Sequence, residues 1–454
     1  MNTLLTLQDL PMDCLQVILD LLKQRAALNF ISTCVQFYKL KFKRLRTNKQ
    51  IDWAVYPYVE VIHGMTQEYN NLRMLRKLKI IEPILGDHKL NISFLPNLEI
   101  LKINSIVTDV SIFPKLRSLK CSGMPIGISK IPLVKLNLYL NDVRDIRLIE
   151  KSSTVRKLTL EETRFNKDEF KINSFYPSVK HLKLRGDYSM GLNLDNLNLT
   201  SLSIGCDSCN SSFSHLTMIE KLDLFSFHQC NGLVGFTNLR SLELHASGIY
   251  DGVLMTMTKL TKLVNLYSSE QDLPLSLKKL KCSYAPDNIY QLTSLTSLYT
   301  YGDHFTGEWL QPMMSRLKVL SISKCDLDLL ESDTLEELNT FKVDLKKLVA
   351  PRLRQLEIDM ESKIDQLVTD RLDTVIIHFD TYAQESHNYN IMINELIEKV
   401  RRFVIFKVRK IHIRRNNSFN IIETKEKVNS SIKGGTKILY EVSNGRKFRK
   451  FRKI

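Results

Sequence analysis

A short apolar phrase recurs along most of this chain and determines its predicted structure. The phrase is Leu-x-x-Leu-x-Leu, in which Ile, Val or Cys sometimes replaces a leucine. Positions four and six of each copy alternate with polar residues, so both point to one side of a short strand. The copies begin roughly every 20 residues, at Leu75, Leu98, Leu116, Leu133, Val155, Val179, Leu199, Ile219, Leu239, Leu260, Leu277, Leu295, Leu317, Leu338, Leu353 and Leu372. A short turn containing Pro, Ser or Thr precedes most of them, as in Phe113-Pro114-Lys115.

One copy cannot bury its apolar side alone, so the copies must stack and share a continuous core of Leu and Ile. The pattern resembles the leucine-rich repeat over residues 70–385. That resemblance implies an α/β fold, an irregular horseshoe-shaped solenoid with a parallel inner sheet. An ordinary leucine-rich α/β protein is the alternative. We expect a helical module at 1–50, the solenoid at 51–390, and a C-terminal cap with a basic tail at 391–454.

The first 50 residues follow a helical period instead. Leu10-Pro11-Met12-Asp13 opens a helix, because Pro suits the first turn and acids there complement the helix dipole. Apolar residues then recur at helical spacing, at Leu15, Ile18, Leu19 and Leu22, and again at Leu28, Phe30, Ile31 and Cys34. So small a unit cannot bury a full core alone, and we expect a partner to complete it.

These residues resemble an F-box. The family's Leu-Pro with an acid two residues later is matched by Leu10, Pro11 and Asp13, and its closing Cys and aromatic by Cys34 and Phe37. The resemblance implies a non-catalytic substrate receptor of a Skp-cullin-F-box ubiquitin ligase, which acts by proximity. The F-box would dock the Skp-type linker and, through it, the cullin scaffold. The linker contact is expected at Leu10, Pro11, Leu15, Ile18, Leu22 and Cys34.

The module departs from the F-box pattern at two places. Arg25-Ala26-Ala27 occupies the region of the usual Asp-Leu step, and Phe37 or Tyr38 replaces the usual Trp. The alternative is therefore a non-ligase leucine-rich repeat scaffold or decoy, whose N-terminal helices only cap the solenoid.

The net charge of +16 is concentrated at the ends of the chain. Residues 398–454 carry 18 Lys and Arg against 4 Asp and Glu, and the last nine interleave cations with Phe448 and Phe451. Three interpretations stay open for this tail: a nuclear-import signal, a nonspecific anchor to nucleic acid or anionic lipid, or a solvated end. Strand-like runs at 403–406, 411–413 and 438–440 precede it, and we expect this first part of the tail to cap the last repeat.

Composition favours a protein of the cytoplasm or the nucleus. We expect no transmembrane segment, because no stretch of eighteen apolar residues occurs, and no secretory signal, because Asp9, Asp13 and Asp20 interrupt the first apolar run. The 8 cysteines are expected to be reduced thiols.

Positions three, five and seven of each repeat should line the open face of the strands. In the early repeats they carry Lys77, Lys79, Lys102, Lys120, Lys135, Lys157, His181, Lys183 and Arg185. Later copies offer Tyr299 and Tyr301, and the last ones turn acidic with Glu357 and Asp359. This basic ladder predicts capture of an acidic or phosphorylated segment of a protein substrate, with the tyrosines supplying apolar contact. The alternative is a solvated face with no ligand, because lysine is readily accommodated at exposed positions.

No catalytic motif occurs in the sequence, and we expect no enzyme activity, cofactor or small-molecule substrate. The one metal-like cluster is Cys206-x-x-Cys209 followed by His228 and Cys230, whose spacing is loosely that of zinc. We favour small residues in tight turns over a metal site there. Cys121 and Cys282 occupy position six of their repeats and are expected to be core.

Overall fold

The structure is a computed structural model, and the chain divides into two compact units, Met1–His228 and Gln229–Ile454. The described residues are 12–21, 44–46, 59–64, 72–80, 95–106, 109–123, 125–139, 150–161, 172–185, 194, 196–205, 215–225, 233, 235–244, 253–265, 272–284, 286, 288–301, 307–370, 372–379, 394–401, 410–415 and 437–442. No helix in this described part is long and apolar enough to cross a bilayer.

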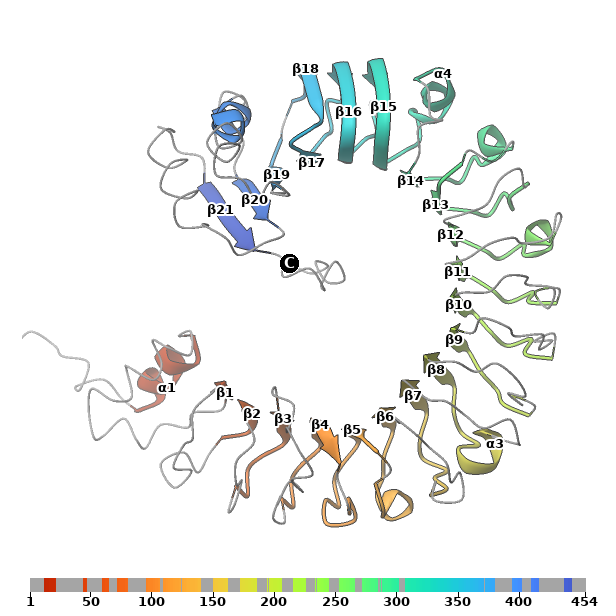
Figure 1. The fold of residues 1–454 in the computed structure, drawn as a ribbon, viewed down its shortest axis with the longest axis vertical. Coiled ribbons are helices and arrows are strands. Elements are labelled where there is room, and N and C mark those ends of the chain that lie inside the picture. Colours follow the sequence, from red (N-terminus) through yellow and green to blue (C-terminus); the bar gives the residue numbers. More distant parts are fainter. Residues whose placement is uncertain are drawn as a thin grey trace, which may run out of the picture. The chain divides into compact units, whose positions relative to one another are not determined.

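Unit 1 contains one helix near its start and then a ladder of short parallel strands (Figure 1). The helix is α1 (Met12–Leu21). The strands are β1 (Arg44–Arg46), β2 (Val61–Gly64), β3 (Lys77–Ile80), β4 (Ile100–Ile106), β5 (Ser118–Ser122), β6 (Lys135–Tyr139), β7 (Lys157–Glu161), β8 (His181–Arg185), β9 (Ser201–Gly205) and β10 (Lys221–Phe225). Each strand pairs in parallel with the next along the chain. The connections hold the short helices η4 (Ile128–Lys130) and α3 (Ile172–Phe175).

Unit 2 has the same architecture, and β15 and β16 are its longest described strands, with 13 residues each. The strands are β11 (Ser241–Leu244), β12 (Lys262–Asn265), β13 (Lys279–Cys282), β14 (Ser297–Thr300), β15 (Val319–Glu331), β16 (Glu337–Val349), β17 (Gln355–Asp359), β18 (Lys363–Val368), β19 (Thr374–Phe379), β20 (Lys410–Arg415) and β21 (Lys437–Val442). All the pairings described are parallel. The short helices are η7 (Leu254–Thr256), η8 (Ile289–Gln291), α4 (Gly307–Leu310) and η9 (Gln311–Met313), and residues 394–401 are also helical. The expected repeat solenoid with a parallel sheet is confirmed.

Columns of leucine form the core of each unit, as the repeat predicts. In unit 1 the position-four residues pair directly across neighbouring strands and are at most 2% exposed: Leu78, Leu101, Leu119, Leu136, Leu158, Leu182, Leu202 and Leu222. Burying one such side chain contributes about 1.5–3 kcal/mol. The stacked copies therefore supply the stability that a single copy lacks.

Backbone hydrogen bonds fix where each strand begins. The Leu116 N–H closes the predicted turn by donating to the carbonyl of Phe113 at 3.0 Å. The N–H groups of Arg117 and Ser118 then both donate to the carbonyl of Glu99 on the preceding turn, at 2.8 and 3.0 Å. The same pair of hydrogen bonds to one carbonyl recurs along both units, so each turn is aligned on the turn before it.

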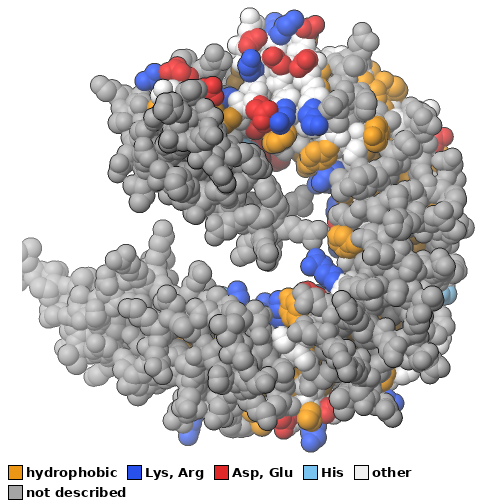
Figure 2. All heavy atoms as spheres, in the orientation of Figure 1, with side chains coloured by type: hydrophobic (Ala, Val, Ile, Leu, Met, Phe, Trp, Pro, Cys, Tyr) orange, Lys and Arg blue, Asp and Glu red, His pale blue; other side chains and the backbone are white. Residues whose placement is uncertain are grey.

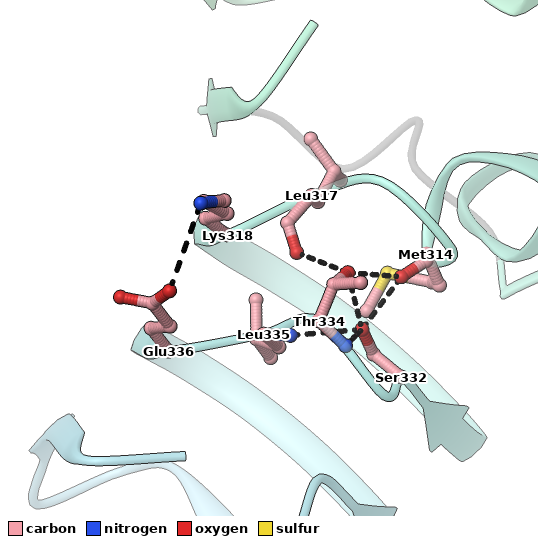
Figure 3. Close-up of polar contacts among 7 residues, drawn as sticks. All are labelled: Met314, Leu317, Lys318, Ser332, Thr334, Leu335 and Glu336. Carbon is pink, nitrogen blue, oxygen red and sulfur yellow. Dashed lines mark hydrogen bonds and ion pairs between the residues drawn. The ribbon is translucent and has the colours of Figure 1, made fainter. Parts of the chain in front are cut away.

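The turn between β15 and β16 is held by side-chain hydroxyls (Figure 3). The Ser332 hydroxyl donates to the Met314 carbonyl at 2.6 Å and accepts the N–H groups of Thr334 at 3.3 Å and Leu335 at 3.1 Å. The Thr334 hydroxyl contacts the carbonyls of Met314 and Leu317 at 3.1 and 2.8 Å. Unit 1 has a similar arrangement at Ser152-Ser153-Thr154.

Replacing Ser332 by Ala should destabilise unit 2 by about 1–3 kcal/mol, because Ser332 is 3% exposed and its loss leaves buried backbone groups without partners. Denaturant unfolding followed by circular dichroism measures the change. Ser315→Ala, in an exposed turn position of the same unit, should shift the midpoint little. Equal midpoints for the two variants would contradict this account of the turn.

Strands β15 and β16 each pass through a left-handed residue, Lys324 with φ 52° and Lys342 with φ 55°. Beyond these residues the two strands continue as 325–331 and 343–349, and β18 pairs with the second of these segments. We call these three segments the outer sheet. Asp359 was expected on the open face, but it is buried at this corner, where backbone N–H groups need an acceptor. Its carboxylate accepts the Lys342 N–H at 3.2 Å and the Ser362 N–H at 2.8 Å.

One repeat start is wrong by three residues. Leu338 pairs with Leu320 and Leu356, so it occupies position four, and Leu335 is the anchor at position one. The sequence is misleading here because Thr340 fills position six, where an apolar residue is expected. Thr340 is nevertheless 4% exposed, and its hydroxyl donates to the carbonyl of Glu357 at 3.4 Å.

The strand-like runs at 411–413 and 438–440 form β20 and β21, which pair in parallel onto β19 and onto each other. These two strands continue the ladder beyond residue 390, into the segment expected to cap it. In unit 1, β1 pairs with β2, so a strand of the ladder already lies within the first 50 residues. The run at 403–406 lies outside the described residues.

Candidate functional site

The open face of unit 1 is the first candidate, and strand alternation creates it. In β6 and β7 the leucines at positions four and six are buried, while Lys135 and Lys157 at position three are exposed. Lys79 and Arg185 are exposed, and Lys77, Lys102, Lys120 and Lys183 are half-buried beside their leucines. The structure therefore places every predicted cation of this ladder on the side of the strands opposite the core.

Register brings three of these lysines into one row. Lys79 is paired with Lys102, and Lys102 with Lys120. Neighbouring strands lie about 4.8 Å apart, so the three side chains emerge side by side. Asn137, Thr159 and Lys183 continue the row on β6, β7 and β8.

Crowding of positive charge shows in the pKa values of this face. Burial is the largest cause that lowers the pKa of Lys102, and the charges of Lys135, Lys77, Lys79 and Lys120 lower it further. The pKa of His181 is lowered likewise, first by burial and then by Lys157, Lys221 and Lys180. A bound anion would relieve this repulsion, so the face is electrostatically suited to an acidic ligand.

Tyr139 is a residue of this face that the sequence reading missed. The Lys120 ammonium lies 4.7 Å from the centre of its ring and donates to its hydroxyl at 2.8 Å. This contact orients Lys120 while leaving its charge in place. Position seven of the repeat that begins at Leu133 carries the signal, because Tyr139 stands there.

In unit 2 the predicted tyrosines lie on the open face and stack with lysines. Lys279 lies 4.5 Å from the ring centre of Tyr299, and Lys281 lies 4.8 Å from that of Tyr301. Tyr301 is 42% exposed, and burial together with the charge of Glu357 raises its pKa. Phe341, 46% exposed, lies on the same side of β16 and was missed with the misplaced repeat start.

Acidic partners make the face of unit 2 more balanced in charge than that of unit 1. Lys262 forms an ion pair with Glu243, and His378 is paired with Glu357. The basic character predicted for the open face is therefore strongest on β3 to β8 of unit 1.

Helix α1 carries part of the expected linker contact. Leu15 and Leu19 are 2% and 3% exposed, so they already pack within the chain, and Ile18 is half-buried. Val17 is 59% exposed and Cys14 is also exposed. The expected contacts at Leu10, Pro11, Leu22 and Cys34 lie outside the described residues.

No group of three or more His, Cys, Asp or Glu in the described part of the chain is arranged to hold a metal ion. The cluster Cys206, Cys209, His228 and Cys230 falls outside that part. Cys121 and Cys282 are buried, as expected for core residues, and burial raises the pKa of each thiol to about 12. Such thiols are unreactive at neutral pH.

Comparisons with known proteins add little to this geometry. No protein-family model matches the chain, and no curated protein matches it. One similar solved structure is the functional domain of InlJ from Listeria monocytogenes, described as including a cysteine ladder. It shares 14% identity over 77% of this chain and 72% of that chain, with a TM-score of 0.35. So weak a likeness carries no argument, and the solenoid assignment rests on the strand register itself.

Proposed function

We propose that the chain is a non-catalytic substrate receptor, whose repeats capture a protein and whose N-terminal helix delivers it to a Skp-cullin-F-box ubiquitin ligase. The row Lys79, Lys102 and Lys120, with Lys135 beside it, is the observation that carries the capture step. An acidic or phosphorylated segment is the expected ligand. The described open face of β3 to β8 carries many cations, and Glu161 is the one acidic residue among its described positions. Such a receptor would act in the cytoplasm or the nucleus.

Acidic protein is a better match to this face than single-stranded nucleic acid. Nonspecific binding of single strands uses exposed aromatic rings on which successive bases stack. On β3 to β8 the described open face offers Tyr139 as its aromatic residue, and the Lys120 ammonium lies over that ring. A ligand that needs charge alone, such as a run of Asp, Glu or phosphoserine, fits without stacking.

The delivery step rests on the resemblance of residues 10–37 to an F-box and on the exposed side of α1. Because Leu15 and Leu19 are buried within the chain, the surface open to a Skp-type linker is the side of Cys14, Val17 and Ile18. The burial of Leu15 and Leu19 also favours the second candidate, in which α1 only caps the solenoid and the protein is a scaffold or decoy.

Val17→Asp should separate the two candidates. If α1 docks a linker, a charge at this exposed apolar site should lower linker co-purification at least about ten-fold, because a few apolar anchors dominate such interfaces. The measurement is affinity purification with mass spectrometry, with and without a proteasome inhibitor. Val134→Asp, a change at another exposed valine of unit 1, is the matched control and should have no effect.

Recovery of linker and cullin with the unaltered chain and the control, and their loss with Val17→Asp, would support the ligase receptor. Recovery of a substrate without linker or cullin from every form would instead support the scaffold. Circular dichroism of both variants checks that the solenoid stays folded.

A further inference from the structure

The outer sheet of unit 2 exposes a groove with an acidic lining. Asp326 and Asp328 of β15, Asp344 of β16 and Asp365 of β18 border it, with Lys346 among them and Leu329 at its side. Their side chains point away from the buried residues of the same strands. Figure 2 shows red acidic side chains gathered with a few blue ones over this part of unit 2.

Negative charge exceeds what Lys346 neutralises. Lys346 forms an ion pair with Asp328 at 2.6 Å. Its pKa is raised, first by the hydrogen bond to Asp328 and then by the charges of Asp328, Asp344 and Asp365. Asp326 and Asp344 form no ion pair with any residue that the structure describes, although Lys363 stands next to Asp344 in register. The groove is thus suited to a cationic segment with apolar side chains for Leu329, which is 41% exposed.

The chain itself ends in such a segment. Residues 446–454 read Arg-Lys-Phe-Arg-Lys-Phe-Arg-Lys-Ile and contain no acid. Cations at close intervals match the aspartates of the groove, and Phe448 and Phe451 match its apolar side. We call these nine residues the basic end segment.

The strand register places the end of β21, from which residues 443–454 follow, at the level of the corner in β16. Val442 is in register with Arg415 on β20, and Arg415 with Phe379 on β19. Asp359 pairs with His378, one residue before Phe379. The tail therefore begins at the level just beyond Asp359, which is where the backbone of Lys342 turns toward the outer sheet.

The distance is within reach. From β21 to β16 the ladder is crossed in four strand spacings, about 19 Å in all. Residues 443–448 span up to about 20 Å when extended, so the later residues of the basic end segment can lie over β16. All of these strands belong to unit 2.

We propose that the acidic groove of the outer sheet is the intramolecular docking site of the basic end segment. The basic end segment would stay bound in the groove unless a competing anion binds the segment. The contact weakens with salt because the groove is exposed. The proposal is independent of ubiquitin ligase function and of the basic face of unit 1.

Lysine-to-lysine cross-linking of the full-length chain tests the contact. A short lysine-reactive cross-linker, followed by mass spectrometry, should join Lys447, Lys450 or Lys453 to Lys346, Lys347 or Lys363. In the double variant Asp326→Asn with Asp344→Asn, the yield of these links should fall at least about five-fold, because two attractive charges are removed. No cross-linkable lysine is lost in that variant.

The matched control is Asp333→Asn with Asp370→Asn, two exposed aspartates of unit 2 away from the groove, and it should keep the links. Raising the salt concentration to about 1 M should remove them. Links that persist undiminished in the groove variant, or their absence in the unaltered chain, would overturn the proposal. A mixture of isotope-labelled and unlabelled chains completes the test, since links that join labelled to unlabelled chains would refute docking within one molecule.

Discussion

Changing Lys102, Lys120 and Lys135 together to Glu is expected to weaken capture of the acidic substrate about 100-fold or more. Each reversal removes one attraction and adds one repulsion, and exposed pairs are worth about 0.2–1 kcal/mol each. The three side chains emerge from adjacent strands, so their effects act on the same stretch of ligand. Binding of the purified substrate, or of an acidic peptide from it, measured by fluorescence anisotropy at several salt concentrations, gives the change.

Net charge alone is controlled by Lys151→Glu, Arg156→Glu and Lys180→Glu, which alter the total charge by the same amount. These cations of unit 1 are exposed but do not occupy positions three, five or seven. The control should lower affinity only slightly, through the long-range field. Equal losses in the two triple variants, or capture that ignores salt, would remove the open face of unit 1 as the binding site.

Asp359→Ala is expected to cost unit 2 about 3 kcal/mol of stability. Asp359 is 6% exposed, and both of its carboxylate oxygens lie 3.2 Å from the N–H of Lys342. Ser362 also donates to this carboxylate, through its N–H and its hydroxyl. Without it, buried donors lose a charged acceptor, and each such bond is worth about 1.5–3 kcal/mol. The left-handed backbone at Lys342 adds strain that these bonds now hold.

Amide hydrogen exchange measures this loss of stability most directly, because a repeat array can open locally without unfolding elsewhere. Exchange at Lys342 and Val343 should become faster in Asp359→Ala. Val343 is included since its N–H donates to Ser362 at 3.0 Å. Asp370→Ala, at an exposed position, serves as the control and should leave exchange at these amides unchanged. Wild-type exchange rates in Asp359→Ala would show that the corner is stable without the carboxylate.

The leucine columns could be predicted from sequence because one physical requirement, burial of apolar side chains at positions four and six, recurs in most copies. The predicted repeat start at Leu338 was wrong, because position six of that repeat is filled by a buried threonine and not by an apolar residue. Thr340 satisfies its hydroxyl on a neighbouring backbone carbonyl, and apolar periodicity does not register such a solution.

The outer sheet could not be predicted, for a different reason. Its origin is a positive φ at Lys324 and Lys342, and lysine has no preference for the left-handed region that would mark these positions. The acidic groove follows from that corner, so it too was absent from the sequence reading. The cations of unit 1, by contrast, could be placed at once, since strand alternation alone determines which side they occupy.

The interleaving of core and face within one short strand has a consequence for how this protein could acquire new ligands. In β6, Leu136 and Leu138 are buried while their neighbours Lys135 and Asn137 meet the open side. A substitution at the exposed Lys135 alters recognition at little cost in folding free energy, since exposed sites tolerate change. The exposed residues of each repeat can thus vary independently of those in other repeats. Single substitutions among them can change which ligand is bound while the buried core stays the same.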